Sequence, residues 1–461
     1  MAGRAATDAI IKGKCAISVN DPGHPLPKGW SRAALTDVAD LGTGHTPSRN
    51  EPDYWDGDIP WIGIRDAGAN HGKVITDTAQ HVTELGLDNS AAVLLPKDTV
   101  CLSRTASVGY VVKMGRDMAT SQDFVNWTCS EAIDPDYLLN ALLAEGEDIR
   151  RFGEGSTHTT IYFPEVKAFH IDLPPAAEQR RIVAKLDALT ARIARARAGL
   201  DRVAVLAKSL RQSALSDAAS QGSSDLSLLE VLAKPIRNGL SVKGSDLPPG
   251  VTALRLSALR GQVVDLLDVR YLPISDERAL AYRLEDGDLL ISRGNGTLSL
   301  VGKAALVSGE GIDAFPIFPD TAFRIRVDRT CMSPEWLSFI WNSHDVRIQI
   351  EGMARTTAGI WKISQRDLAA IKLPRLSLAR QQQSLKRLQA AFARADRMEA
   401  EAARARKLLD RLESAILARA FRGELVPQDP NDEPASVLLE RIRAERAKAP
   451  MPERGRRKAD P

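Results

Sequence analysis

The chain has 461 residues, of which 44% are hydrophobic and 26% are charged. This length suits two to four globular domains, and the composition excludes a wholly disordered or fibrous protein. Lys and Arg number 62 against 59 Asp and Glu, a formal net charge of +3. That balance excludes a uniformly basic nucleic-acid binder, so any contact with DNA must come from local patches.

Signals for membrane insertion, secretion and cysteine chemistry are missing from the sequence. No apolar run approaches the roughly 18 residues of a membrane span, and residues 1–13 lack the apolar stretch of a signal peptide. The four cysteines stand far apart with no CxxC pair, which argues against a disulfide framework or a zinc ribbon. We therefore expect a cytoplasmic protein, away from any membrane, with reduced cysteines.

The first globular segment, residues 28–175, follows an N-terminal extension, residues 1–27, for which the sequence indicates no role. Short apolar strands such as 98–103 and 110–114 lie between glycine-rich turns, and Asp134 followed by Pro135 is a typical helix start. The segment is predicted to be mixed α/β.

A long helix is expected at residues 176–216. Its apolar or alanine positions alternate in steps of four and three, which is the heptad pattern of a coiled coil, and they fall at 182, 186, 189, 193, 196, 200, 203, 207, 210 and 214. Gly199 lies inside this helix, where it costs about 1 kcal/mol relative to Ala, so a kink at that position is one option.

A linker and a second globular segment, residues 217–375, repeat the first segment at a period near 200 residues. Both copies contain a strand followed by Ser-Arg and a polar loop, then a helix start of the form Asp-Pro or Ser-Pro. The matching stretches are 95–109 with 284–302, 134–139 with 333–338, 155–161 with 354–360, and 171–174 with 371–374. A repeat of this kind predicts two copies of one fold.

The second copy also ends in a long helix, residues 376–423, before a C-terminal segment at 424–461 whose last residues are rich in Arg and Lys. The helix has a similar seam, at 385, 388, 392, 395, 398, 402, 405, 409, 412 and 416. Two helices packed on their own domains would be the simpler interpretation. Their length, roughly 60 Å each, and their recurrence favour instead an antiparallel coiled coil. The predicted fold class is α+β, with two mixed α/β domains in pseudo-twofold arrangement and two long helices.

Polar loops recur at matching places in the two globular segments. Residues 42–48 and 238–243 open the segments, Arg104 and Arg293 follow strands, and loops at 157–160 and 355–357 close them. Small hydroxyls, backbone amides and Arg are the groups that contact phosphates and guanine edges. Each loop taken alone also fits an ordinary turn, so it is the recurrence that favours a shared role.

Catalytic signatures do not occur in the sequence. There is no GxxxxGK[ST] loop, no HExxH and no GxSxG elbow, and the seven histidines show no metal-ligand spacing. The seven tryptophans are interpreted as core residues, although Trp55 lies in a polar stretch. A non-catalytic binding protein is the simplest reading.

Three stretches resemble the specificity (S) subunits of type I restriction-modification enzymes. Gly44-His-Thr-Pro-Ser48 with Tyr54-Trp-Asp-Gly-Asp-Ile-Pro-Trp-Ile62 looks like the opening of a target recognition domain, and Leu173-Pro-Pro-Ala-Ala-Glu-Gln-Arg-Arg-Ile-Val183 looks like the entry into the first conserved helix. The most specific stretch is residues 415–436, at the end of the second helix. The second segment lacks the Thr-Pro-Ser and Ile-Pro-Trp stretches, and its residues 373–381 depart from the Leu-Pro-Pro…Glu-Gln form.

This resemblance implies a DNA-binding subunit that is not itself an enzyme. Each recognition domain would read one half of a split double-stranded DNA target, and the helices would set the spacer. Two methyltransferase (M) subunits would dock on the helices and the 423–439 tail and use S-adenosylmethionine. Motor-nuclease (R) subunits would use ATP and Mg. The residues carried over as DNA-binding are Thr46, Ser48, Arg104, Thr105, Ser107, Thr157 and Thr159 in the first segment and Ser241, Lys243, Arg293, Asn295, Arg355 and Thr356 in the second.

Two rival functions remain open on the sequence alone. One is a coiled-coil adaptor whose globular segments bind proteins, and the other is a DNA-binding subunit of a defence system that does not methylate. A DNA reader should lose affinity steeply with salt, whereas an adaptor should not.

Overall fold

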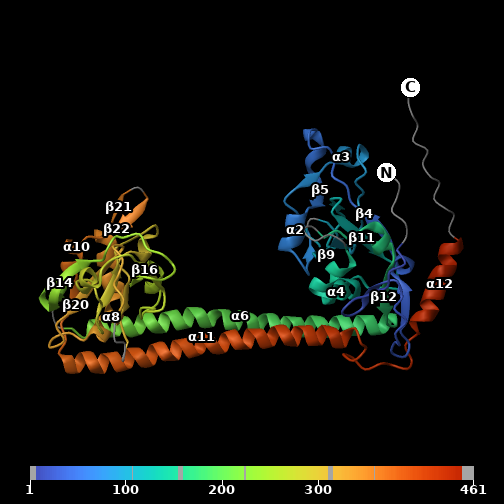
Figure 1. The fold of residues 1–461 in the computed structure, drawn as a ribbon. Coiled ribbons are helices and arrows are strands. Elements are labelled where there is room, and N and C mark those ends of the chain that lie inside the picture. The colour runs from blue at the N-terminus through green and yellow to red at the C-terminus, as the bar shows by residue number, and fades with distance from the viewer. Residues whose placement is uncertain are drawn as a thin grey trace. The chain divides into compact units, whose positions relative to one another are not determined.

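The computed structural model describes residues 7–105, 107–153, 159–222, 225–309, 315–357 and 359–448 (Figure 1). The chain divides into two compact units: the first is Met1–Arg197 with Arg406–Pro461, and the second is Ala198–Ala405. Among the described residues, no helix is long and apolar enough to cross a membrane. The cysteines are all free thiols.

Three sheets form the strand framework of the first unit. The central one has five strands in the order β4 (Ala39–Thr43), β11 (Phe124–Cys129), β8 (Val100–Ser103), β9 (Val111–Met114) and β6 (Val74–Ile75). A four-stranded sheet has the order β1 (Ile11–Lys12), β2 (Ile17–Val19), β12 (Phe169–Leu173) and β3 (Ser31–Ala34). A three-stranded sheet has the order β10 (Ala119–Thr120), β5 (Trp55–Ile62) and β7 (His81–Val82).

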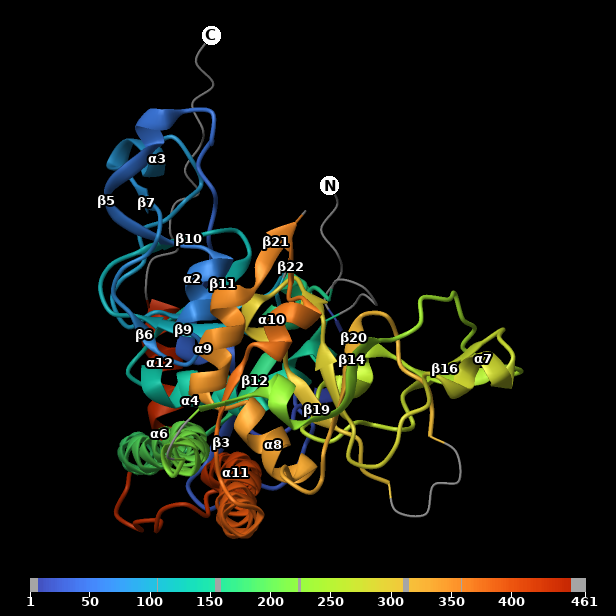
Figure 2. The same ribbon diagram turned by 90° about the vertical axis from the view of Figure 1, so that its left-hand side faces the viewer.

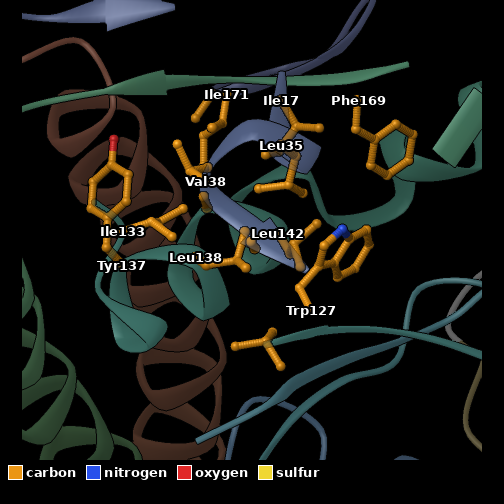
Figure 3. Close-up of a cluster of buried hydrophobic side chains, with 14 of the residues drawn as sticks. Ile17, Leu35, Val38, Trp127, Ile133, Tyr137, Leu138, Leu142, Phe169 and Ile171 are labelled. Atoms are coloured by element: carbon orange, nitrogen blue, oxygen red, sulfur yellow. The ribbon is translucent and has the colours of Figure 1, made fainter. Parts of the chain in front are cut away.

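The helix α4 (Pro135–Glu145) packs on this framework and supplies much of its core. Asp134 caps the helix, since its side chain accepts hydrogen bonds from the backbone N–H groups of Asp136 and Tyr137. Leu138 and Tyr137 are fully buried with Trp127 (Figure 3), and each large side chain buried in this way stabilises the fold by about 1.5–3 kcal/mol. The short helices of the unit are α1 (Leu35–Val38), α2 (Ile64–Ala69), α3 (Glu84–Asp88) and α5 (Phe163–Lys167).

The second unit has a four-stranded sheet in the order β14 (Leu232–Asn238), β20 (Ala322–Val327), β17 (Leu289–Ser292) and β19 (Ala304–Leu306). Smaller sheets pair β13 (Asp225–Ser227) with β23 (Lys372–Pro374), β15 (Val251–Leu254) with β16 (Val269–Leu272), and β18 (Gly294–Asn295) with β22 (Ile360–Lys362) and β21 (Arg355–Thr357). The helices are α7 (Asp276–Leu280), α8 (Pro334–Trp341), α9 (His344–Met353) and α10 (Gln365–Ala369). Trp336 and Trp341 are fully buried in its core.

Sheet topology confirms the internal repeat. The order β4-β11-β8-β9 in the first unit corresponds to β14-β20-β17-β19 in the second, and every neighbouring pair in both series is antiparallel. The predicted helix starts are also found, with Asp134 capping α4 and Ser333 capping α8. Of the seven tryptophans predicted to be core residues, Trp55 and Trp361 are only partly buried.

The two long helices are α6 (Ala176–Ser220) and α11 (Leu378–Ala420). All seam positions predicted in α6 are at least partly buried except Ala196, which is exposed. In α11 all of them are at least partly buried except Leu412. The helix is not broken at Gly199, because α6 continues through that residue. Side-chain packing along the seam outweighs the small helix propensity of one glycine.

Arginine ion pairs join the two helices within each unit. In the first unit, Arg197 contacts Asp410 and Glu413, each at 2.7 Å. In the second, Arg211 contacts Asp396 at 2.6 Å and Glu399 at 2.8 Å. In each unit, one arginine of α6 thus bridges two carboxylates that stand three residues apart on α11.

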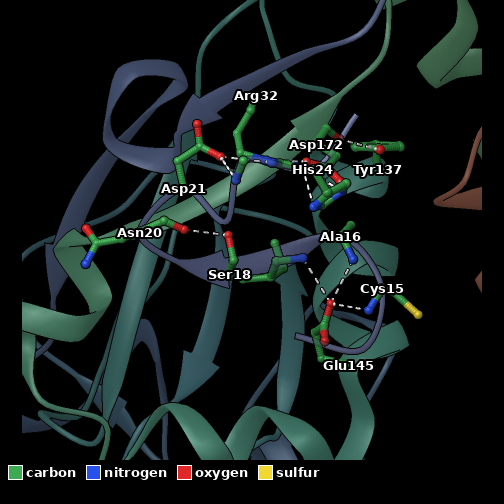
Figure 4. A network of polar contacts seen from close by, with 12 residues as sticks. Cys15, Ala16, Ser18, Asn20, Asp21, His24, Arg32, Tyr137, Glu145 and Asp172 are labelled. Atoms are coloured by element: carbon green, nitrogen blue, oxygen red, sulfur yellow. Dashed lines mark hydrogen bonds and ion pairs between the residues drawn. The ribbon is translucent and has the colours of Figure 1, made fainter. Parts of the chain in front are cut away.

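The N-terminal extension is part of the first unit. Strands β1 and β2 complete the sheet that contains β12 and β3. The buried carboxylate of Glu145, at the end of α4, accepts backbone hydrogen bonds from Cys15 at 3.1 Å, Ala16 at 2.8 Å and Ile17 at 3.0 Å (Figure 4). Residues 11–19 are therefore held to the domain by side chains far along the sequence.

The C-terminal segment returns to the same unit. Arg181 in α6 binds Asp432 with both terminal nitrogens, at 2.5 and 3.2 Å. A further helix, α12 (Ala435–Lys448), follows, and it buries Leu439 and Ile442. Since the sequence predicted only a docking segment and a basic tail there, this helix is an addition to the prediction.

Candidate nucleic-acid interface

In the first unit, the predicted loops leave one end of the central sheet. Ser103, the last residue of β8, pairs with Phe124, the first residue of β11, while Thr43 at the end of β4 pairs with Val125. Arg104 follows at once: its N–H donates to the carbonyl of Asp123 at 2.8 Å, and its own carbonyl accepts from the N–H of Ile161 at 2.9 Å. The loops that follow β4 and β8 and the segment before Ile161 are thereby brought together.

Gln122 and Asp123, just before β11, are the centre of this cluster. The Thr46 hydroxyl donates to the side-chain oxygen of Gln122, and the Arg104 guanidinium donates to the Gln122 backbone carbonyl at 3.3 Å. Thr105 donates its hydroxyl to the Asp123 carboxylate at 2.5 Å. Three of the predicted residues therefore meet around a dipeptide that sequence reasoning did not single out.

Arg104 is held partly out of water. Its guanidinium lies over the Phe163 ring at 5.0 Å, and among the described residues its Nε has no hydrogen-bond partner. Burial lowers the pKa of Arg104, and the nearby Asp123 carboxylate opposes that shift. The group stays cationic, because an arginine is charged at any physiological pH. A guanidinium held in a partly dry site is suited to an anionic ligand, although the Nε itself is covered by protein.

Two tryptophans fix the loop that carries Thr46 and Ser48. The indole of Trp61 donates to the His45 carbonyl at 3.0 Å, and that of Trp55 donates to the Ser48 carbonyl at 3.0 Å. Arg49, which sequence reasoning missed, lies over the Trp55 ring at 4.8 Å. The Ile-Pro-Trp motif thus serves to hold the Thr-Pro-Ser loop in place.

The remaining residues predicted in the first unit have different surroundings. Ser107 belongs to the turn after β8, where its carbonyl accepts from the Ser103 hydroxyl at 2.5 Å. Thr159 is half-buried and lies two residues before Ile161, next to the Arg104 backbone. Thr157 lies outside the described residues.

The second unit builds the same frame from different side chains. Ser292 at the end of β17 pairs with Ala322 at the start of β20. The N–H of Arg293 donates to the Thr321 carbonyl at 2.8 Å, and its carbonyl accepts from Ile363 at 3.1 Å. These bonds match those of Arg104 in partner and direction.

The loop after β14 also has its counterpart in the first unit. Gly239 and Gly44 occupy equivalent places, since a Cβ on either would lie 2.1 Å from a carbonyl oxygen of the strand opposite. In the residue that follows each glycine, the N–H donates to a carbonyl across the sheet end: Leu240 to Phe318 at 3.0 Å, and His45 to Thr120 at 2.9 Å. Counting onward, Ser241 corresponds to Thr46 and Lys243 to Ser48, and both Ser241 and Lys243 are exposed.

Asn295, Arg355 and Thr356 lie on a small sheet and not in loops as predicted. Asn295 and Thr356 pair with Trp361 from either side, and Arg355 pairs with Lys362. The predicted 355–357 loop is therefore wrong, because strand β22 supplies both neighbours with ladder hydrogen bonds. The sheet nonetheless brings these three residues close to Arg293, which lies just before β18.

A cavity of about 460 Å³ adjoins this sheet, lined in part by Asn295, Ser292, Arg260 and Lys303. Arg260 and Lys303 are basic residues that sequence reasoning did not select. In the described parts of the chain, no group of three His, Cys, Asp or Glu side chains could hold a metal ion.

Comparison with known proteins finds similarity to one kind of protein. Residues 27–200 match the family model of the type I restriction modification DNA specificity domain. The chain is 27% identical to the specificity subunit of the type I restriction enzyme EcoKI from Escherichia coli K12, over 92% of this chain and 96% of that protein. The chain is similar to type I specificity subunits over nearly its whole length.

Two solved structures share the fold of this chain. A chain from a type I restriction-modification complex aligns with a TM-score of 0.68 and 20% identity, covering 87% of this chain and all of that one. The HsdS subunit from Thermoanaerobacter tengcongensis aligns with a TM-score of 0.59 and 20% identity, over 88% of this chain and 99% of its own. The predicted fold class, two mixed α/β domains with long paired helices, is confirmed.

Proposed function

We propose that this chain is a specificity subunit that reads a split, asymmetric DNA target, one half with each unit. The observation that carries the proposal is the repeated loop cluster at the end of each central sheet, where an arginine with a matching backbone frame follows β8 and β17. Arginine and hydroxyl groups on exposed loops are suited to phosphate oxygens and base edges.

The two clusters differ in the side chains they present. Thr46 corresponds to Ser241 and Ser48 to Lys243, and the aromatic support from Trp55 and Trp61 has no counterpart motif in the second unit. Since the pattern of donors and acceptors decides which base edge is bound, equal frames with unequal side chains favour two different half-sites.

The long helices are proposed to set the spacer between the half-sites and to dock two methyltransferase subunits. A helix of 45 residues is about 65 Å long, which compares with roughly 34–36 Å for one turn of DNA. The ion pairs of Arg197 and Arg211 fix the register of α6 against α11. A fixed register is what a spacer-setting element requires.

Catalysis is assigned to the partners under this proposal. The methyltransferase subunits would use S-adenosylmethionine to methylate the target, and motor-nuclease subunits would use ATP and Mg. The chain itself would contribute the choice of sequence. The exposed faces of α6 and α11 and the 423–439 segment remain the proposed docking surface.

Mapping of methyladenine across the source genome, with this gene present and deleted, tests the proposal. We expect a split motif with two defined halves to lose its methylation on deletion. Replacing residues 28–175 by the matching segment of a relative should change one half and leave the other half unchanged. Deleting the heptad 191–197 should alter the spacer or abolish assembly. A map that deletion leaves unchanged would refute the proposed function.

A further inference from the structure

In each loop cluster, one backbone carbonyl accepts the N–H of the arginine that follows the strand. The residue that precedes this carbonyl's residue occupies the same place in both clusters. In the first unit this carbonyl belongs to Asp123 and the preceding residue is Gln122; in the second it belongs to Thr321 and the preceding residue is Asp320. Both positions lie two residues before the first residue of the strand that pairs with the end of β8 or β17. The frame therefore presents residue 122 and residue 320 in the same way.

Gln122 is exposed and its side chain is already oriented. Thr46 donates its hydroxyl to the amide oxygen, while Arg104 holds the backbone carbonyl of the same residue at 3.3 Å. No described residue accepts a hydrogen bond from the amide nitrogen. The amide can thus offer a donor and its remaining acceptor lone pair to a ligand, and this is the pair that adenine N7 and N6 complement in the major groove.

Asp320 offers the opposite chemistry at the matching place. It is partly exposed, and within the described parts of the chain no group donates a hydrogen bond to its carboxylate. An ionised carboxylate can only accept, and close to DNA phosphates it is repelled unless it meets a donor. Cytosine N4 is the base-edge donor that Asp accepts from in the major groove.

We infer that Gln122 and Asp320 are the specificity-determining residues of the two clusters, with Gln122 selecting adenine in one half-site and Asp320 selecting cytosine in the other. Thr46 and Arg104 act as positioning residues for Gln122. The inference rests on the proposed function, because it names the residues through which each unit would read its half-site.

The test replaces the amide at residue 122 by a carboxylate, and the carboxylate at residue 320 by an amide, in the complete complex. In the source strain, the chromosomal gene is replaced by Gln122→Glu or by Asp320→Asn, and methyladenine is mapped. Gln122→Glu should replace adenine by cytosine at one position of one half-site, and Asp320→Asn should do the reverse at one position of the other. The matched controls Gln221→Glu and Asp225→Asn make the same changes at exposed positions between α6 and β14, outside the loop clusters and the proposed docking surface, and should leave the motif unchanged.

If a variant abolishes methylation, DNA binding by the purified complex is measured instead. Duplexes that carry each of the four bases at every motif position are compared. We expect the preference at one position to fall by about 5- to 150-fold, equivalent to about 1–3 kcal/mol, with other positions unaffected. Equal weakening on all duplexes, or an unchanged motif in both variants, would overturn the inference. Either result would leave the proposed function standing, since that function fails only if deletion of the gene leaves the methylation map unchanged.

Discussion

Gln381 joins the second unit's domain to its long helix, and its replacement by Ala should be costly. The side chain is buried near the start of α11: its oxygen accepts from the Ser333 N–H at 2.8 Å, and its nitrogen donates to the carbonyls of Cys331 and Leu376, each at 2.9 Å. At about 1 kcal/mol for each hydrogen bond, Gln381→Ala should destabilise the unit by about 3 kcal/mol. The Ser333 N–H and the carbonyls of Cys331 and Leu376 then lose this partner.

The neighbouring residue provides the control. Gln382 is of the same type, lies on the same helix and is exposed, so Gln382→Ala should change stability by less than about 0.5 kcal/mol. Native-state hydrogen exchange reports the effect locally, because the Ser333 amide loses its acceptor only in the first variant. If Gln381→Ala left both the protection of Ser333 and the urea midpoint equal to those of Gln382→Ala, the hydrogen-bond argument would be refuted.

Three other changes test separate features of the fold. Gly199→Ala should stabilise the chain by about 1 kcal/mol in urea unfolding, because a Cβ at Gly199 would meet no atom within 4 Å; a loss of stability would show that the glycine is needed for packing. Glu145→Gln should cost about 1–3 kcal/mol and speed hydrogen exchange at Lys14, because the amide oxygen can keep the Ala16 and Ile17 donors on Oε1 whereas the amide nitrogen would face the Lys14 N–H, which donates to Oε2. Unchanged exchange at Lys14 would contradict this. The ion pair with Arg181 lowers the pKa of Asp432 below its ordinary 3.8, so the pair stabilises the C-terminal segment at pH values above about 3.8, and that contribution is lost as the pH falls through the lowered pKa. Limited proteolysis with an acid-active protease should show the release only as the pH falls below about 3.8, and Asp432→Asn should remove this pH dependence.

The repeat and the helices could be predicted from the sequence because their signals are local. Heptad spacing is visible residue by residue, and Pro135 and Pro334 follow capping residues. The seam fails only at Ala196 and Leu412. Arg197 and Glu413, the residues that follow these two positions, make an ion pair with each other at 2.7 Å. Heptad counting does not detect such a polar contact.

The candidate site could be predicted only in part, because tertiary placement selects its members. Arg104 and Arg293 were identified since each follows a strand with a Ser-Arg signature. Gln122 and Asp320 lie in short connections with no motif, and only the pairing of β8 with β11 and of β17 with β20 brings them to the arginines. A repeat alignment extended through 119–124 and 317–322 would have been the one sequence signal available for them.

A net charge near zero is compatible with DNA binding, because some basic side chains form ion pairs with carboxylates of the protein and others do not. Those in the framework are neutralised within the protein: Arg32 pairs with Asp172, Arg326 with Asp288, and Arg211 with two carboxylates. In contrast, the cluster residues Arg293 and Lys243 form no ion pair with any described residue. A net charge near zero therefore does not mean that every basic side chain is paired with a carboxylate of the protein. If the unpaired cations contact DNA phosphates, as proposed above, the net charge of the whole chain carries little information about that contact.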